Sequence, residues 1–358
     1  MENSPSYNGS GLVNLVSEIE RRMVGTSAFD GLSDEASVSD ASTYVLVLFD
    51  GLGLAQLEHR DGHVFRSSLA GTLDAPFPTT TPVSLSTIAT GLSPSLHGQV
   101  AHLSWYPDLD LVVNTLKWVT VTGDHVAYDY GGVLPRPNLW ERLRSEGIEP
   151  ITVQPGDFQT SPLTRVLYRG ARFEGAWDAD DLVEATVALA AEGGRLIFTY
   201  VPFVDVAGHV FGQGSDEFTA AMKAAATVWE GIASRLPPGV ALIGTADHGL
   251  MEVSEDDKIL VRDPHFESLR FAGDTRGVHL WGNPGLMDDL AVSVGGKLVD
   301  PVGWLGPNPT PAALSHVGQQ LLLAPPGKAV IPKGFDKRLR CYHGGLTSDE
   351  LEIPLLLG

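Results

Sequence analysis

The chain has 358 residues, of which 43% are hydrophobic and 19% charged, so it can bury a large core and global disorder is not expected. Its formal net charge of −20 argues against a broad nucleic-acid-binding face, because phosphate backbones attract clustered Lys and Arg side chains. An anionic substrate would be repelled overall, and it would need a local positive centre such as bound metal ions.

Residues 1–40 predict one helix and a linker, with no targeting signal. The helix is expected over 12–23 and the linker over 33–43. Residues 1–22 lack a basic region followed by an apolar core, and the chain has no run of about 18 apolar residues. The single cysteine, Cys341, excludes an intramolecular disulfide and fits a reducing compartment. We therefore expect a cytoplasmic protein without a membrane span, with a mature secreted form as the alternative.

A sheet of buried strands is predicted from residue 44 onward. Residues 44–49 form a continuous apolar run that ends at Asp50, which is typical of a strand buried on both faces of a parallel sheet. Strands then alternate with helices, which predicts the α/β class, with a mostly parallel central sheet and helices on both faces. The further helices are expected over 82–91, 139–146, 180–192 and 215–236, and the further strands over 148–153, 195–201 and 240–245.

Two stretches interrupt this alternation and predict a small cap or insert. Residues 103–137 are rich in aromatic side chains and Asp, which favours a cap or a substrate-facing excursion. Residues 251–340 are rich in Pro and Gly and favour a β-ribbon with one or two helices beside the core. The aromatic side chains either stack on a substrate base or form the core of the cap itself; they include Trp105, Tyr106 and Trp118.

Asp and His residues gather where the apolar strands end, and both types are good ligands for zinc and similar divalent ions. Asp205 and His209 lie four residues apart, so one helical turn would direct both toward one ion. Asp247 and His248 are adjacent and can share an ion if the chain turns at Gly249. The candidate ligands are Asp50, Asp205, His209, Asp247, His248 and His343.

A phosphate-binding helix start is predicted at Thr81. This residue directly precedes Pro82, so Thr81 suits the N-cap and Pro82 the first helical position. The hydroxyl and the neighbouring backbone N–H groups would then lie at the positive end of the helix, where phosphate binds. A metal ion that touches the hydroxyl would lower its pKa and make it a nucleophile.

With these motifs, the chain resembles the alkaline phosphatase superfamily, and most closely its type I phosphodiesterase/nucleotide pyrophosphatase branch. The resemblance spans residues 44–354, and the motifs occur in the family's order. It implies an alkaline-phosphatase-like catalytic domain over residues 41–358. The motifs are Leu-Phe-Asp-Gly at 48–51, Phe-Pro-Thr-Thr-Thr at 77–81 with Ala-Thr-Gly-Leu-Ser-Pro at 89–94 and His-Gly at 97–98, Asp205-x3-His209, Asp-His-Gly at 247–249 and His-Gly-Gly at 343–345.

The resemblance also implies two divalent cations, of which Zn suits the ligands best and Mn or Fe are alternatives. Thr81 would be the nucleophile, and a shift of one residue among the consecutive threonines would move this role to Thr80. The first ion would be held by Asp50, Thr81, Asp247 and His248, and the second by Asp205, His209 and His343.

Two residues bear on the substrate. The diesterase branch holds a phosphate oxygen with an Asn downstream of the nucleophile, and gapless counting from Thr81 places His102 there. Lys117 resembles the Lys or Arg phosphate contact of monoesterase relatives. The resemblance implies hydrolysis of phosphodiester or pyrophosphate bonds in small, nucleotide-like substrates through a phosphothreonine. The alternatives are a phosphomonoesterase or phosphonate hydrolase on the same site, and an inactive metal-binding scaffold.

Two residues near these motifs are expected to be structural. His97 follows a Gly-Leu-Ser-Pro turn, which favours packing or capping. Cys341 lies two residues before His343 and is expected to be a small buried side chain rather than a ligand. The expected partner is a small phosphate-containing substrate, with no nucleic-acid polymer and no membrane span, and the oligomeric state is open.

Overall fold

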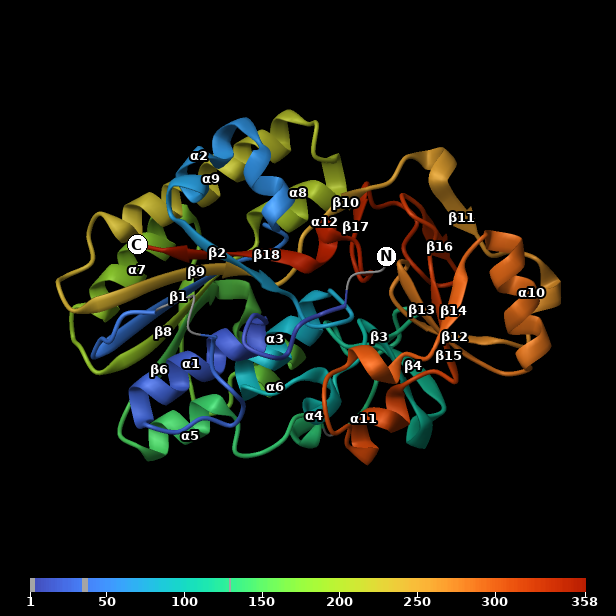
Figure 1. Cartoon of the computed structure of the whole chain (residues 1–358), viewed down its shortest axis with the longest axis horizontal. Helices are drawn as coiled ribbons and strands as arrows, with labels where there is room; N and C mark the ends of the chain where they lie inside the picture. Colours follow the sequence, from blue (N-terminus) through green and yellow to red (C-terminus); the bar gives the residue numbers. More distant parts are fainter. Residues whose placement is uncertain (1–3, 34–37, 129) are drawn as a thin grey trace.

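The computed structural model describes residues 4–33, 38–128 and 130–358, and it places two sheets next to each other (Figure 1). Within these residues, the first sheet has seven strands in the order β2-β18-β9-β1-β8-β6-β7. From β9 to β7 all neighbouring strands are parallel, which confirms the predicted mostly parallel sheet. Strand β18 is antiparallel to both of its neighbours, β9 and β2. The strands are β1 (Thr43–Phe49), β2 (Leu69–Asp74), β6 (Glu149–Pro155), β7 (Arg172–Ala176), β8 (Arg195–Val201), β9 (Val240–Ala246) and β18 (Glu352–Leu357).

Helices cover both faces of this sheet, as predicted (Figure 1). Every residue of β1 and β8 is buried, because these central strands have helices above and below them. One face is covered by α1 (Leu12–Val24), α3 (Thr81–Thr90), α5 (Leu139–Ser145) and α6 (Pro162–Leu167), and the other by α2 (His63–Ser67), α7 (Ala179–Ala190), α8 (Phe203–Phe211) and α9 (Asp216–Ala233).

The N-terminal helix α1 packs into the main core. Its apolar residues Leu12, Leu15, Val16 and Ile19 recur at helical spacing and are all buried, on the side that faces α3 and α5. Part of the predicted linker over 33–43 lies outside the described residues, at 34–37. The proposed division of the chain at residue 40 stays a prediction.

The two stretches that interrupt the alternation come together in a second sheet, which the sequence did not reveal. Leu103 in β3 pairs with Gly273 in β12, and this joins residues 103–137 to residues 251–340. Among the described residues the sheet has seven strands, in the order β14-β15-β13-β12-β3-β4-β5. They are β3 (Leu103–Tyr106), β4 (Leu111–Asn114), β5 (Val119–Thr120), β12 (Arg270–Gly273), β13 (Gly277–Trp281), β14 (Lys297–Val299) and β15 (Gln320–Leu323).

Short elements complete the second unit and connect it to the first. These helices are α4 (Pro94–His97), α10 (Pro284–Val294), α11 (Pro311–His316) and α12 (Ser348–Leu351); the strand pairs are β10 (Met251–Glu252) with β17 (Cys341–Tyr342) and β11 (Lys258–Leu260) with β16 (Ala329–Ile331).

Within the described residues, no helix is long and apolar enough to cross a membrane.

Tyr7 ties the N-terminal segment to both units. Its side chain is buried, and its hydroxyl donates to the Trp304 carbonyl at 2.8 Å and accepts from the Phe77 N–H at 3.2 Å. Phe77 leads directly into the threonine segment that begins α3. The Tyr7 hydroxyl therefore connects the second unit to the segment that leads into Thr81.

We predict that Tyr7→Phe lowers the free energy of unfolding by about 1–3 kcal/mol, because it leaves a buried N–H and a half-buried carbonyl without a partner. Urea denaturation measures this loss. The matched control is Tyr128→Phe, since the Tyr128 hydroxyl makes no hydrogen bond to another described residue. Equal stability of the two variants would contradict the role of Tyr7.

Candidate active site

The first group of predicted ligands lies at the carboxyl edge of the central sheet. Phe49 in β1 is in register with Ala246 in β9, so Asp50 and Asp247 leave adjacent parallel strands at the same level. Gly51 follows with φ of 73°, a conformation that suits glycine, and its N–H donates to Asp247 Oδ1 at 3.0 Å. The sheet register therefore brings together residues that are almost two hundred positions apart.

We call Asp50, Asp247 and His248 the first ligand set. One carboxylate oxygen of each Asp and the Nε2 atom of His248 lie close together. His248 Nε2 lies 3.6 Å from Asp50 Oδ1 and 3.4 Å from Asp247 Oδ2. Both of these carboxylate oxygens are buried and have no hydrogen-bond partner among the described residues. Their other oxygens are held in place, since Tyr200 donates to Asp50 Oδ2 and the His248 N–H donates to Asp247 Oδ1.

The second ligand set consists of Asp205, His209 and His343. Asp205 and His209 lie in the first and last turns of α8, and His209 Nε2 is 3.2 Å from Asp205 Oδ1. His343 follows β17 and places its Nε2 4.0 Å from the same oxygen. Asp205 Oδ1 is again buried without a hydrogen-bond partner in the described parts of the chain.

All three histidines turn their Nδ1 atoms toward backbone carbonyls. The separations are 3.1 Å from His248 to Gly249 O, 2.7 Å from His209 to Cys341 O and 2.9 Å from His343 to Thr79 O. A carbonyl only accepts, so each Nδ1 carries the proton and each Nε2 is left with a lone pair. This is the arrangement by which backbone groups orient metal-binding histidines.

The two ligand sets are adjacent, and their charged and polar groups shift one another's pKa values. The His248 and His343 rings stack with centroids 3.8 Å apart. Burial and the carboxylates of Asp247 and Asp205 raise the pKa of Asp50 well above its usual range. Burial and the neighbouring His248 and His209 lower the pKa of His343. Divalent cations bind carboxylate oxygens and imidazole lone pairs, and here such atoms face one another without hydrogen-bond partners among the described residues. These residues therefore fit a pair of metal ions.

The three consecutive threonines have three different environments. Thr79 Oγ1 donates to the Gly345 carbonyl at 2.9 Å and accepts from the Gly344 N–H at 3.0 Å. The Thr80 hydroxyl donates to Asp274 Oδ1 at 3.2 Å. The Thr81 hydroxyl lies 3.2 Å from His248 Nε2, at the first ligand set. Of the three hydroxyls, only that of Thr81 faces the predicted ligands.

The N-cap assignment needs a correction of one residue. Thr80, with extended φ and ψ of −145° and 144°, is the N-cap of α3, and Thr81 is the first helical residue. The reason is that the Thr80 carbonyl, rather than that of Thr81, accepts the first helical hydrogen bond, from Ser84 at 3.1 Å. The Thr81 N–H makes no hydrogen bond within the described residues, so it remains available at the positive end of the helix.

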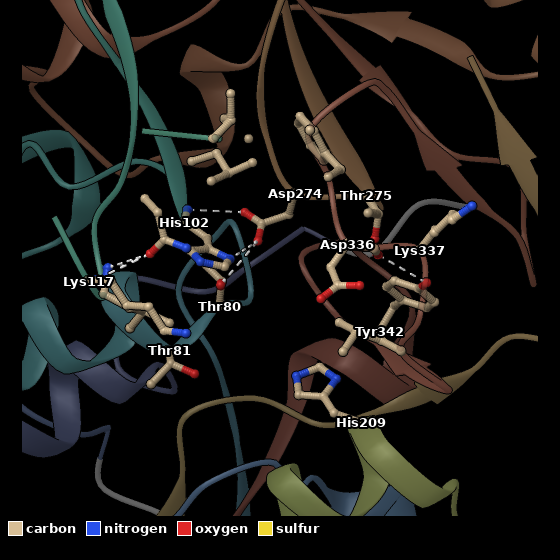
Figure 2. A pocket seen from close by; sticks show the side chains of 18 of the residues that line it. Thr80, Thr81, His102, Lys117, His209, Asp274, Thr275, Asp336, Lys337 and Tyr342 are labelled. Atoms are coloured by element: carbon tan, nitrogen blue, oxygen red, sulfur yellow. Dashed lines mark hydrogen bonds and ion pairs between the residues drawn. The ribbon is translucent and has the colours of Figure 1, made fainter. Parts of the chain in front are cut away.

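His102 and Lys117 reach the same cavity as Thr81. This cavity of about 870 Å³ lies between the ligand sets and the second sheet, and Figure 2 shows Lys117 beside Thr81. His102 is in the cavity wall, where burial lowers its pKa to about 4, opposed by a hydrogen bond with Asn114. Asn114 also lines the cavity, and its Oδ1 accepts from the Lys117 N–H at 3.2 Å. Asn114 was not among the predicted residues, because nothing beside it in the chain indicates a site.

The remaining assignments are structural. His97 is buried, with Nε2 3.1 Å from Thr87 Oγ1 and Nδ1 accepting from the Gln99 N–H at 3.1 Å, and its pKa is lowered to about 3 by burial. Cys341 is buried and lies outside both ligand sets. Four aromatic side chains of residues 103–137 do not line the cavity: Tyr106, Trp118 and Tyr128 form one cluster, and Trp105 lies against Arg270.

The fold is shared with solved structures of a phosphodiesterase and a phosphonate hydrolase. Murine ectonucleotide pyrophosphatase/phosphodiesterase 5 is 18% identical, with 87% of each chain covered and a TM-score of 0.63. The human protein of the same name is 17% identical, with 88% of this chain and 87% of that chain covered and a TM-score of 0.61. Phosphonoacetate hydrolase from Sinorhizobium meliloti 1021 is 16% identical, with 90% of this chain and 92% of that chain covered and a TM-score of 0.65.

The sequence itself gives the family. No curated protein matches the chain. The family described as type I phosphodiesterase/nucleotide pyrophosphatase matches residues 44–297, which is well over half of the chain and includes Asp50, Thr81, Asp205, His209 and the Asp247-His248 pair. The protein therefore belongs to the type I phosphodiesterase/nucleotide pyrophosphatase family of hydrolases, within the alkaline phosphatase superfamily.

Proposed function

We propose that the protein hydrolyses phosphodiester or pyrophosphate bonds of small substrates, with Thr81 as the nucleophile and two divalent cations as cofactors. The observation that carries this proposal is the Thr81 hydroxyl beside the first ligand set, with the second ligand set adjacent to it. Two complete, adjacent ligand sets with a hydroxyl beside the first of them are what a two-metal hydrolase needs, which argues against an inactive metal-binding scaffold.

Each residue would then have a defined task. When bound, the cations neutralise charge on the phosphoryl oxygens and lower the pKa of the threonine hydroxyl, and zinc suits the ligands best. Thr81 Oγ1 forms a bond to phosphorus as the bond to the leaving oxygen breaks, which gives a phosphothreonine that water hydrolyses. The Thr81 N–H and the His102 imidazole donate hydrogen bonds to the remaining phosphoryl oxygen.

The family and one of the solved relatives support this chemistry and substrate class. One murine structure of ectonucleotide pyrophosphatase/phosphodiesterase 5 is described as an inactive threonine-to-alanine variant in complex with AMP. A threonine is thus needed for activity in that protein, and a nucleoside monophosphate binds there. By analogy, we infer a nucleotide-like phosphate substrate for this chain.

A phosphonate or phosphomonoester substrate is the second candidate, and the cavity lining favours it. Lys117 extends toward Thr81, and a cation there suits the extra negative charge of a monoester or phosphonate (Figure 2). Trp105, Tyr106, Trp118 and Tyr128 do not line the cavity, so the aromatic surface open to a substrate there comes from Phe335 and Tyr342. Phosphonoacetate hydrolase, solved with phosphonoacetate, has the same fold.

We predict that Thr81→Ala lowers the turnover of bis-p-nitrophenyl phosphate by roughly 10³-fold or more, because the nucleophile is lost. Thr81→Ser keeps a hydroxyl at the same place and should retain part of the activity. Thr227→Ala, on the exposed face of α9, is the matched control. Near-normal turnover by Thr81→Ala would show that another group attacks phosphorus.

Chelation should abolish turnover, and addition of Zn²⁺, Mn²⁺ or Co²⁺ should restore it, because both ligand sets need a cation. Elemental analysis should give two ions per chain, one for each ligand set, and one fewer in His343→Ala. His265→Ala, an exposed histidine outside both sets, should keep the metal content. Full activity after complete removal of metal would rule out the proposed cofactors.

Lys117→Ala separates the two substrate candidates. It should raise the KM for p-nitrophenyl phosphate or phosphonoacetate roughly tenfold, and change the KM for bis-p-nitrophenyl phosphate much less, since a diester carries one negative charge fewer. Lys223→Ala, on the exposed side of α9, controls for the loss of a positive charge. Equal effects on monoester and diester would exclude a selective role for Lys117.

A further inference from the structure

Asp274 is a buried carboxylate at the tip of a hairpin in the second sheet, and it lines the cavity opposite Thr81. Its side chain is 6% exposed. Backbone hydrogen bonds of 2.9 and 3.1 Å between Asp274 and Gly277 close the tight turn between β12 and β13. Because burial disfavours a charged carboxylate, such a group must find hydrogen-bond donors.

The donors come from two segments next to the proposed reaction centre. The Thr80 hydroxyl donates to Asp274 Oδ1 at 3.2 Å, and the His102 backbone N–H donates to Oδ2 at 3.4 Å (Figure 2). The His102 ring is also close, with Nδ1 4.0 Å from Oδ1. Burial raises the pKa of Asp274 to about 7, and the hydrogen bonds from His102 and Thr80 oppose this rise.

Both partners of Asp274 determine where other groups lie. Thr80 is the N-cap of α3, and its carbonyl accepts the first helical hydrogen bonds, from Val83 at 3.0 Å and Ser84 at 3.1 Å. Fixing the Thr80 side chain therefore fixes the start of the helix on which Thr81 is the first residue. His102 directly precedes β3, so its position depends on the same carboxylate.

The hairpin tip is itself held firmly. Arg276, in the same turn, forms a buried ion pair with Glu350, with N–O distances from 3.3 Å. Gly344 packs so closely on Asp274 that a Cβ at Gly344 would lie 2.4 Å from the Asp274 Cβ. Asp274 thus sits on a rigid support that also contacts the segment carrying His343, and its contacts are set by the surrounding structure.

We propose that Asp274 is a positioning residue for phosphoryl transfer. It holds Thr80 and His102 so that the Thr81 hydroxyl and the His102 imidazole meet the phosphoryl group in a fixed relative orientation. This inference rests on the proposed function of Thr81. Asp274 belongs to neither ligand set, so it acts through its two neighbours. Orientation of this kind has a large effect, because a displacement of about 1 Å costs on the order of 100-fold in rate.

Four variants of the metal-loaded full chain test the proposal with bis-p-nitrophenyl phosphate as substrate. Asp274→Ala removes both contacts, and Thr80→Val removes one hydroxyl at nearly constant volume. Thr80→Ser keeps the hydroxyl. Asp274→Asn removes the charge but keeps both contacts, because its carbonyl accepts from the His102 N–H and its amide donates to the Thr80 oxygen. Asp110→Ala removes an exposed carboxylate of the second unit and is the control.

We expect Asp274→Ala and Thr80→Val to lower kcat by roughly tenfold to 100-fold with a smaller change in KM, while the metal content stays near wild type and Thr80→Val remains folded at the assay temperature. Thr80→Ser and Asp274→Asn should recover most of the loss. Because Asp274→Ala already removes the contact that Thr80→Val removes, the double variant Asp274→Ala/Thr80→Val should be no slower than Asp274→Ala alone.

Three results would overturn the proposal. The first is an unchanged kcat in a folded Asp274→Ala or Thr80→Val, and the second is loss of bound metal in Asp274→Ala, which would make Asp274 a ligand. The third is equal loss in Thr80→Ser and Thr80→Val, which would make the hydroxyl irrelevant. If wild-type protein turned over no phosphate ester or phosphonate, the proposed function would fail first; an active wild type with insensitive variants would refute Asp274 alone.

Discussion

Repulsion among buried carboxylates is the constraint on which the rest of this structure depends. Asp50, Asp205 and Asp247 meet at one sheet edge, and Asp50 has its pKa raised well above the usual range by burial and by the other two. At a separation of about 4 Å, a like-charge pair near a protein surface costs about 4 kcal/mol. Each of the three keeps one oxygen without a hydrogen-bond partner among the described residues. The divalent cations that we propose would remove this repulsion and would bind to these oxygens.

The surrounding backbone is arranged to direct lone pairs at the same place. The carbonyls of Gly249, Cys341 and Thr79 each face a histidine Nδ1, and these carbonyls come from three separate segments. Thr79 makes contacts through both its carbonyl and its side chain, since its hydroxyl also forms hydrogen bonds with Gly344 and Gly345 beside His343. The threonine run thus links the C-terminal segment to the start of α3. Its three hydroxyls differ in chemistry because each faces a different neighbour.

The second sheet forms one wall of the cavity beside the two ligand sets. In a chain with a net charge of −20, the cavity carries local positive charge from Lys117 and would gain more from bound cations. The wall is joined to the first unit through the buried pair of Arg276 and Glu350, at 3.3 Å, and through Asp274. Breaking a buried ion pair costs about 3–5 kcal/mol, so the two units are coupled in stability as well as in position. Through this coupling, Asp274 in its proposed positioning role links the second sheet to the chemistry at the first.

The sequence by itself was enough to predict the central sheet and to single out the candidate ligands. Apolar runs as short as residues 44–49 favour buried strands, and the polar residue after such a strand lies at the carboxyl edge, so the placement of Asp50 and Asp247 was predictable from local pattern. Tertiary structure alone decided the second sheet, because the pairing of Leu103 with Gly273 depends on contacts far apart in the chain. It also decided which threonine is the N-cap and that Asp274 faces Thr80, since a side chain's role there is set by the partner that folding brings to it.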